Sequence, residues 1–206
     1  SEEQLEYMRE NGVPEWYIES CLKIKYLFPK AHAVAYCLMS YRIAYYKVYY
    51  PAAFYATYFN TKLSDFVYSI IINGLESIQV ALKSYAQRFD LTARDEGIRK
   101  VLEVAEEMYA RDIKIDRADL YKSHASKFIL SEKEGYILPP LSSVDNVSEA
   151  MAIDIVNERD KGEFISIEDL NKRTAVNKNA LESLKNFGII DGLGEKNQMS
   201  LFDGIF

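Results

Sequence analysis

Acidic residues are absent from residues 21–62, although Asp and Glu outnumber Lys and Arg, 31 to 25, in the 206-residue chain as a whole. The same stretch carries six Lys or Arg residues, His32 and nine of the 16 tyrosines. Local charge, rather than net charge, decides whether a surface attracts a polyanion. The net charge of -6 therefore does not exclude a nucleic-acid partner for this stretch.

Cysteine and histidine are scarce, with two residues of each kind in the chain. Cys21 and Cys37 lie among apolar residues, and we expect no secretory leader before them. This predicts reduced thiols in an intracellular protein rather than a disulfide framework. Together with His32 and His124 the cysteines match no zinc-ligand spacing, so we expect no metal site in the chain.

The sequence also lacks a run with the length and apolarity of a membrane-spanning helix, which needs about 20 mainly apolar residues. Arg42 and Lys47 interrupt the acid-free stretch and Pro51 breaks it. Hydrophobic residues make up 49% of the chain and charged residues 27%, as in ordinary soluble globular proteins. We therefore expect one or two globular domains and no membrane partner.

The acid-free stretch combines basic with aromatic side chains. Lys and Arg bind phosphates through charge and hydrogen bonds, and aromatic rings stack on bases. A helix that carries both kinds of side chain suits a nucleotide or a nucleic-acid strand. The alternative is that the tyrosines pack a core while the bases form a solvated face, and composition alone favours this alternative.

The fold is expected to be mainly α, because apolar residues recur at helical spacing and Gly and Pro mark the ends of the segments. Segment 65–72 has strand propensity, but its surroundings favour helix. Segment 129–138 is expected to form a small hairpin with turn residues at 132–135. Helices are predicted over residues 2–10, 14–26, 31–50, 52–59, 75–89, 95–113, 117–128, 149–159, 166–173 and 178–187.

The Pro-Pro pair at 139–140 is a candidate domain boundary, and two units of similar construction follow it. Each unit has a turn, at 144–148 and at 174–177, that leads into a helix. Ser166 can cap the helix before the second turn, with Asp169 near the N-terminus of that helix. Backbone N–H groups at such helix starts can hold a phosphate oxygen, although a helical bundle without a ligand is the alternative.

The end of the sequence contains the pentapeptide QMSLF at 198–202, in which a polar amide precedes two apolar residues. Short motifs of this kind bind by placing Leu201 and Phe202 in a hydrophobic pocket while Gln198 forms a hydrogen bond nearby. The apolar residues could instead pack on their own domain. The motif alone leaves both interpretations open.

Four segments, in this order, resemble the C-terminal part of the replicative α subunit of bacterial DNA polymerase III, PolC type. The resemblance covers residues 12–202, with a looser match over 62–116. Because the sequence opens inside a helical pattern, we expect it to be a piece of a longer chain. The segments are GVPEWYIESCLKIKYLFPKAHAVAY (12–36), YPAAFYATYF (50–59), GEFISIEDLNKR (162–173) and NQMSLF (197–202).

The resemblance implies part of an enzyme that adds deoxynucleotides to a primer 3′ end by Mg²⁺-dependent phosphoryl transfer. It places the metal-binding carboxylates in a palm that precedes this segment, so we expect no catalytic residue here and no activity from the segment alone. It implies fingers over 1–115, a helix-hairpin-helix domain on duplex DNA over 116–190 and a flexible tail over 191–206. The residues expected to contact nucleotide or template are Lys25, Lys30, His32, Arg42 and Lys47.

The first hairpin departs from the pattern of that family. The family has glycines there, whereas this chain has DNVSEAMA, with Asn146 and Ser148 at the glycine positions. Asn tolerates a left-handed backbone and Ser does not, so phosphate binding by this hairpin stays open. Lys161 and Lys178 complete the residues expected to contact duplex DNA.

The resemblance also implies that the pentapeptide is a sliding-clamp-binding motif, which raises the effective concentration of polymerase at the primer end. Its residues are Gln198, Met199, Ser200, Leu201 and Phe202, with Met199 where Leu is commoner. The expected partners are primer–template DNA, dNTP, the sliding clamp (β subunit), the rest of the polymerase chain and the replisome, in the cytoplasm at the nucleoid. The alternatives are a non-enzymatic helical DNA-binding or clamp-adaptor protein and a purely structural helical interaction module.

Overall fold

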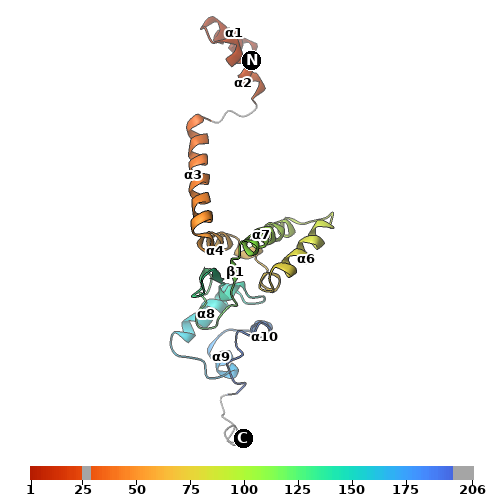
Figure 1. The fold of residues 1–206 in the computed structure, drawn as a ribbon, viewed down its shortest axis with the longest axis vertical. Coiled ribbons are helices and arrows are strands. Elements are labelled where there is room, and N and C mark those ends of the chain that lie inside the picture. Colours follow the sequence, from red (N-terminus) through yellow and green to blue (C-terminus); the bar gives the residue numbers. More distant parts are fainter. Residues whose placement is uncertain (25–28, 197–206) are drawn as a thin grey trace, which may run out of the picture. The chain divides into compact units, whose positions relative to one another are not determined.

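The computed structural model describes residues 1–24 and 29–196, and the chain is mainly helical throughout these residues (Figure 1). The expected mainly α fold is thus confirmed. The chain groups into two compact units, Ser1–Tyr45 and Tyr46–Phe206. Lys25 and the QMSLF residues at 198–202 lie outside the described residues.

The first unit is built from a pair of short helices and most of a long one. Arg9 binds both carboxylate oxygens of Glu15, at 3.1 and 3.0 Å, across the Asn-Gly turn between the short helices. Gly12 in this turn has a φ of 71°, in the left-handed region that glycine adopts without strain. The helices are α1 (Glu2–Glu10), α2 (Glu15–Lys23) and α3 (Lys30–Tyr49), whose last residues belong to the second unit.

α3 contains no buried residue. Tyr36 and Tyr41, for example, have 64% and 73% of their surfaces exposed. Tyr55 and Tyr68, by contrast, are fully buried in the second unit. Core packing therefore accounts for Tyr55 and Tyr68 and does not account for the exposed tyrosines on α3.

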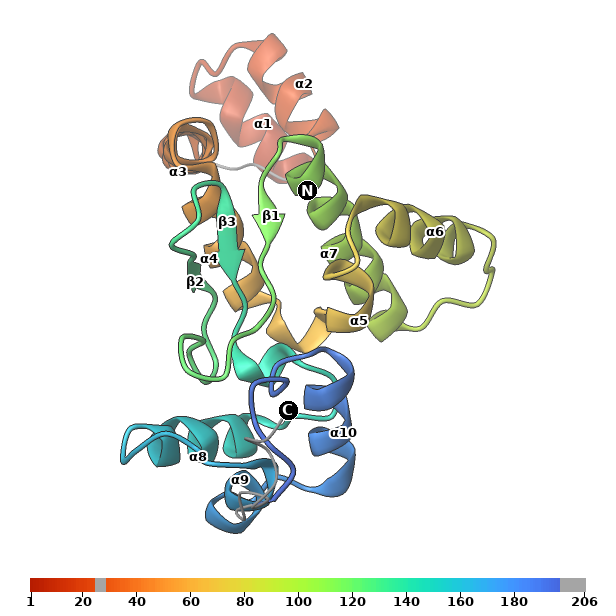
Figure 2. The same cartoon turned by 60° about the horizontal axis from the view of Figure 1, so that its bottom comes forward.

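The second unit begins with a set of helices that follow one another closely. α6 and α7 form an antiparallel hairpin, and α5 lies against α6 (Figure 2). Segment 65–72 contains helix and no strand, as its surroundings predicted. It holds the last residue of a 3-10 helix and a short α-helix. The elements are α4 (Pro51–Thr61), the 3-10 helix η1 (Leu63–Asp65), α5 (Tyr68–Ile71), α6 (Leu75–Ala86) and α7 (Ala93–Ala110).

A small three-stranded sheet follows, made of β1 (Lys114–Ile115), β2 (Ile129–Leu130) and β3 (Tyr136–Leu138). β3 lies in the centre, antiparallel to β2 and parallel to β1. The predicted hairpin over 129–138 is confirmed. The parallel strand β1 was not predicted, because two residues carry no recognisable alternation.

The helix predicted over 117–128 is wrong. The segment forms turns, since the side chain of Asp119 accepts hydrogen bonds from the N–H groups of Tyr121 and Lys122, at 2.8 Å each. The hydroxyl of Ser123 in turn accepts from the N–H of Asp119, at 2.9 Å. Short polar side chains that bind nearby backbone in this way compete with helix formation.

The last elements gather together at one end of the second unit (Figure 2). The bounds of the three α-helices agree with the predicted helices to within one residue, whereas the 3-10 helix was not predicted. They are the 3-10 helix η2 (Leu141–Ser143), α8 (Glu149–Arg159), α9 (Ile167–Arg173) and α10 (Lys178–Asn186).

One apolar core runs through the second unit on both sides of residue 115, where the sequence places a functional boundary. Phe59 and Ile71 before this residue belong to the same cluster as Ile155 and Leu184 after it, and all four are fully buried. The division at 115 concerns function and stays a prediction.

Two findings concern what the described residues lack. No helix within 1–24 and 29–196 is long and apolar enough to cross a membrane. The same residues include no group of three or more His, Cys, Asp or Glu side chains that could hold a metal ion. Cys21 and Cys37 are free thiols.

Candidate nucleic-acid interface

The bases predicted to contact nucleotide or template lie along α3, apart from Lys25, which is outside the described residues. Lys30 is the first residue of the helix, and the ring of His32 lies 4.5 Å from that of Tyr36. Lys30 and His32 are two residues apart, so they project about 160° apart around the helix axis. α3 by itself therefore does not gather Lys30, His32 and Arg42 on one face, and their role stays a prediction.

Lys47, near the end of α3, is engaged with α7 and α4. Its amine lies 2.7 Å from Glu107 Oε2 and 5.3 Å from the centre of the Phe54 ring. Arg111 adds a hydrogen bond of 3.2 Å to the backbone carbonyl of Lys47. These contacts join the last residues of α3, which belong to the second unit, to α4 and α7, and they balance the charge of Lys47. Sequence reasoning could not find them, because 60 residues separate Lys47 from Glu107.

The first hairpin, at 144–148, closes without glycine. Asn146 has a φ of 66°, the left-handed conformation for which Asn is suited. Ser148 has φ -72° and ψ 159°, an extended backbone that any residue adopts, and its hydroxyl caps α8 by accepting from the N–H of Met151. The sequence objection to Ser148 is therefore removed, because its position requires no left-handed backbone.

The second hairpin, at 174–177, also leads into a capped helix, although none of its residues has a positive φ. Thr174 bonds its hydroxyl to the carbonyl of Leu170, at 2.7 Å, and ends α9. Asn177 caps α10 by accepting from the N–H of Ala180, at 2.9 Å. Lys178 is the first residue of α10 and is exposed. The two hairpins thus each deliver a capped helix start to the surface.

Two hydrogen bonds join the hairpins to each other's helices. The side-chain amide of Asn146 donates to the hydroxyl of Ser183 on α10, at 2.9 Å. The carboxylate of Asp154 on α8 accepts from the N–H of Ala175 in the second hairpin, at 2.6 Å. Sequence spacing did not indicate the partner of Asn146 or the partner of Asp154.

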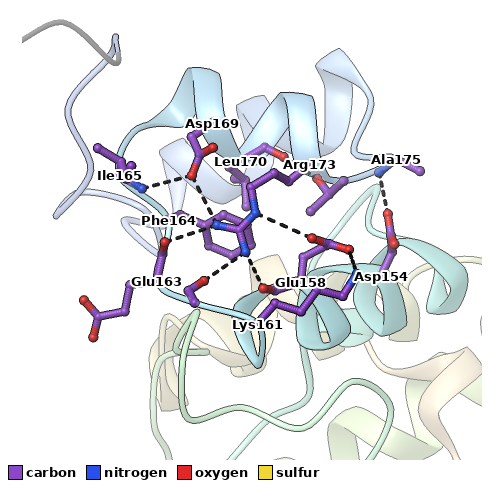
Figure 3. Close-up of polar contacts among 12 residues, drawn as sticks. Asp154, Glu158, Lys161, Glu163, Phe164, Ile165, Asp169, Leu170, Arg173 and Ala175 are labelled. Atoms are coloured by element: carbon purple, nitrogen blue, oxygen red, sulfur yellow. Dashed lines mark hydrogen bonds and ion pairs between the residues drawn. The ribbon is translucent and has the colours of Figure 1, made fainter.

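Arg173 lies at the centre of the polar contacts that join α8, α9 and the loop between them (Figure 3). Its guanidinium donates to the backbone carbonyls of Glu158, Gly162 (2.9 Å) and Glu163 (3.1 Å). It also pairs with the carboxylates of Asp169, at 3.2 Å, and Glu158, at 3.5 Å. Sequence reasoning missed this residue, although Asp169 four positions earlier was a signal for a helical ion pair.

The ring of Phe164 and the amine of Lys161 complete this cluster. The Arg173 guanidinium stacks 4.5 Å from the centre of the Phe164 ring. Lys161, one of the predicted DNA-binding residues, is paired with Glu158. The hydrogen bond from Lys161, followed by that from Arg173, lowers the pKa of Glu158 below its ordinary value. Lys161 therefore holds a local carboxylate in the described structure.

The helix starts after the two hairpins carry N–H groups that are free to bind an anion. Within the described residues, no acceptor binds the N–H groups of Glu149 and Ala150 at α8 or of Lys178 and Asn179 at α10. The N-terminus of an α-helix carries a partial positive charge and binds phosphate readily. The arrangement can therefore hold two phosphates through backbone groups alone.

The helix-hairpin-helix motif family matches residues 112–199 of the chain, the part that contains both hairpins. The curated relatives are larger proteins named DNA polymerase III PolC-type. That of Caldanaerobacter subterraneus subsp. tengcongensis is 51% identical over 203 residues, and that of Clostridium perfringens 47% over 203 residues. That of Bacillus subtilis is 42% identical over 198 residues.

These matches cover 96% to 98% of this chain but 14% of each of the three polymerases. The chain therefore spans about one seventh of the length of the curated relatives that it matches. The resemblance found in the four sequence segments is confirmed by these identities. Over nearly its whole length, the chain is homologous to a segment of PolC-type DNA polymerase III, and its second half carries a helix-hairpin-helix motif.

Proposed function

We propose that this chain is the part of a replicative DNA polymerase that contacts the primer–template and the sliding clamp. The observation that carries this proposal is the identity of 42% to 51% to PolC-type polymerases over nearly the whole chain. The free helix starts after both hairpins support it independently, because they offer phosphate sites without reading bases. The adaptor alternative has no comparable support.

The hairpins are proposed to grip the duplex backbone, and the second is proposed to bind more strongly. Lys178 adds a positive charge at the start of α10, whereas Asp145 and Glu149 flank the start of α8. Like charges near a phosphate weaken its binding. Asn146 and Ser148 then shape the first hairpin rather than contact phosphate through their side chains.

The bases of α3 are proposed to contact the incoming nucleotide or the template, together with Lys25. The exposed tyrosines beside Arg42 offer stacking surfaces of the kind that unpaired bases use. Lys47, held by Glu107, supports this site by fixing the end of the helix. A second element is required to complete the site, since Lys30 and His32 project to different sides of α3.

The phosphoryl-transfer reaction is proposed to occur outside this chain. Phosphoryl transfer by polymerases uses Mg²⁺ ions held by carboxylates, and residues 1–24 and 29–196 offer no cluster of that kind. The complete polymerase would supply the carboxylates, act at the nucleoid and assemble with the replisome. Robust primer extension by a pure preparation of this chain alone would contradict this division.

The QMSLF residues are proposed to bind the sliding clamp, with Leu201 and Phe202 as the apolar anchors. Changing both to Ala should abolish binding to the cognate clamp ring, measured by calorimetry. A matched control is available in the same tail, because Ile205→Ala with Phe206→Ala removes a similar pair of apolar side chains outside the motif. Equal losses from the two double variants would show that the motif is not the binding site.

A titration with primer–template duplex at two salt concentrations tests the duplex contact. Binding through backbone phosphates weakens steeply as salt rises. We expect a fall of about tenfold or more between low and moderate salt for a site that neutralises several phosphates. Absence of salt-sensitive binding would favour a purely structural module.

A further inference from the structure

A cavity of about 470 Å³ lies beside the small sheet, near the turn after α10 where Gly188 has a φ of 68°. Its apolar lining includes Ile129, Leu138 and Ile189. Ligand sites in proteins are usually clefts of about 300 to 1,000 Å³ with an apolar lining and a few polar groups. This cavity, which we call the sheet cavity, has that size and that kind of lining. Within the described residues, its lining includes none from α3 or from the two hairpins.

The wall of the sheet cavity carries equal numbers of acidic and basic side chains. Asp116 pairs with Lys133, at 3.0 Å, and Lys122 pairs with Glu132, at 2.7 Å. A polyanion binds where basic side chains are in excess. The balanced wall therefore favours a ligand with apolar and polar parts over a nucleic-acid backbone. The charged lining residues are Asp116, Asp119, Glu132, Arg117, Lys122 and Lys133.

Two charged groups of this wall keep hydrogen-bonding capacity for a ligand. Within the described residues, the guanidinium of Arg117 pairs with no carboxylate, and Asp191, which lies near it beside Gly188, forms no ion pair with it. One carboxylate oxygen of Asp119 accepts two backbone N–H groups, whereas the other has no donor in the described part of the chain. The wall thus offers both donors and an acceptor, which suits a ligand that carries both kinds of group.

The edge of β2 adds a third open position, at Leu130, which also lines the sheet cavity. The N–H of Ser131 donates to the carbonyl of Tyr136, at 3.0 Å, so the alternation of an antiparallel ladder directs the N–H and carbonyl of Leu130 away from β3. Two residues earlier, the side-chain amide of Asn60 binds both backbone groups of Phe128, at 2.7 and 3.2 Å. No described residue binds those of Leu130, which has 56% of its surface exposed. An open strand edge pairs readily with the backbone of another chain.

We propose that the sheet cavity and the open edge of β2 bind an extended peptide segment of a partner protein, with an apolar side chain in the cavity and a neighbouring carboxylate on Arg117. The backbone of the segment pairs with Leu130, and its apolar side chain lies on Ile129 and Ile189. A peptide supplies the backbone donors and acceptors that a strand edge requires. The inference goes beyond the proposed function, because no residue proposed to contact DNA, nucleotide or clamp lines the cavity.

Selection from a displayed library of random nine-residue peptides on the full chain tests the proposal. We expect the enriched peptides to share an apolar residue beside Asp or Glu. Leu130→Pro removes the N–H at the open edge, where an edge strand tolerates proline, and should weaken their binding about tenfold or more. Leu130→Ala keeps that N–H and is the matched control, with binding within about threefold of the unmodified chain. Enrichment of no peptide, or equal binding to the proline variant and the unmodified chain, would overturn the inference.

A matched pair of peptides tests the contact with Arg117. One is an enriched peptide, and the other has Asn or Gln in place of its Asp or Glu. The unmodified chain should bind the acidic peptide about threefold more tightly, the usual size for an exposed ion pair. Arg117→Gln should remove this preference, whereas Arg94→Gln on α7 should keep it. Equal affinity of the unmodified chain for both peptides would refute the contact with a carboxylate.

Backbone amide chemical shifts then distinguish a peptide site from a nucleic-acid site. An enriched peptide should shift the amide signals of Ile129, Leu130 and Ile189, and primer–template duplex should leave them unchanged. Shifts of the same signals by duplex, without shifts by peptide, would assign the sheet cavity to nucleic acid and overturn the proposal.

Discussion

The hairpins at 144–148 and 174–177 both lead into capped helix starts but differ in backbone and in charge. Asn146 in the first has a left-handed backbone, whereas no residue of the second has a positive φ. Each leads through a side-chain cap into a helix whose first N–H groups are free within the described residues. Asp145 and Glu149 flank the first helix start, and Lys178 begins the second helix. A capped helix start with free N–H groups thus occurs beside acidic residues as well as beside a basic one, so a hairpin can keep such a start after its surroundings cease to favour an anion.

The two hairpins also depend on each other. Asn146 binds Ser183 on the helix of the second hairpin, and Asp154 on the helix of the first binds Ala175 in the second. Arg173 then fixes the loop between α8 and α9. An acidic first hairpin can therefore serve DNA binding indirectly, by positioning the second one.

The largest effect is expected from Arg173→Ala, which removes the link between α8 and α9. The change leaves Asp169 without its cation and leaves Glu158 paired with Lys161 alone, and the two carboxylate side chains are 16% and 17% exposed. We expect the free energy of unfolding to fall by about 3 kcal/mol, as for other broken partly buried pairs. Urea unfolding measures this loss.

The control for Arg173 is Arg94→Ala, which removes an exposed guanidinium from the first turn of α7. Its effect should stay within about 0.5 kcal/mol, as for surface substitutions away from such clusters. Similar losses in both variants would show that the cluster around Arg173 contributes nothing particular, and the dependence between the hairpins would lose its basis.

The next effect separates backbone strain from side-chain bonding at Asn146. Asn146→Ala should destabilise the fold by about 1 to 2 kcal/mol, because Ala is strained at positive φ and the bond to Ser183 is lost. Asn146→Gly loses the same bond without the strain and should cost less. Thermal unfolding of both variants gives the comparison, and a glycine variant less stable than the alanine variant would contradict the left-handed backbone.

Charge reversal tests the difference between the hairpins directly. Lys178→Glu should weaken duplex binding several-fold, and Glu149→Lys should strengthen it by a smaller factor, since rim charges change affinity by about 1 kcal/mol or less. Lys100→Glu on α7 makes the same charge change on another exposed lysine. If Lys100→Glu weakened binding as much as Lys178→Glu, the second hairpin would not be the preferred phosphate site.

The smallest expected effect is on the stability of the fold at acid pH. Hydrogen bonds from Lys161 and Arg173 lower the pKa of Glu158, so the folded state favours its charged form. This contribution to stability is present above the ordinary glutamate value of 4.5 and is lost as the pH falls below it. Glu158→Gln should flatten the decline in urea midpoint between neutral and acid pH, whereas Glu182→Gln on α10 should leave the decline unchanged.

Local signals predicted most of the helices, and long-range contacts explain the failures. Ser166 and Asp169 mark the start of α9 within a few residues of sequence, and they cap it as expected. The partner of Lys47 is 60 residues away, so nothing near Lys47 announced that its charge would be balanced. Asp119 changed a helical pattern into turns through its own side chain, which periodicity does not register.

Sequence reasoning was limited in the same way at the candidate nucleic-acid interface. The family resemblance led us to expect both Lys161 and Lys178 on duplex DNA, and only the structure shows that Lys161 is paired with Glu158. The left-handed backbone at Asn146 followed from its residue type and its place in the hairpin. The hydrogen bonds from the N–H groups of Ile167 and Glu168 to the carbonyls of Gly194 and Glu195 were not predicted, because main-chain carbonyls leave no trace in the amino-acid sequence.

The turn at Gly188 carries a practical consequence for anyone who modifies this protein. A β-carbon at this position would lie 2.7 Å from both Arg117 Nη1 and Asp191 Oδ2, so any side chain would have to displace a charged group. A fluorescent label or affinity tag introduced there would disturb the packing that leads to the tail. Reporters are better attached at Lys196, whose side chain is exposed.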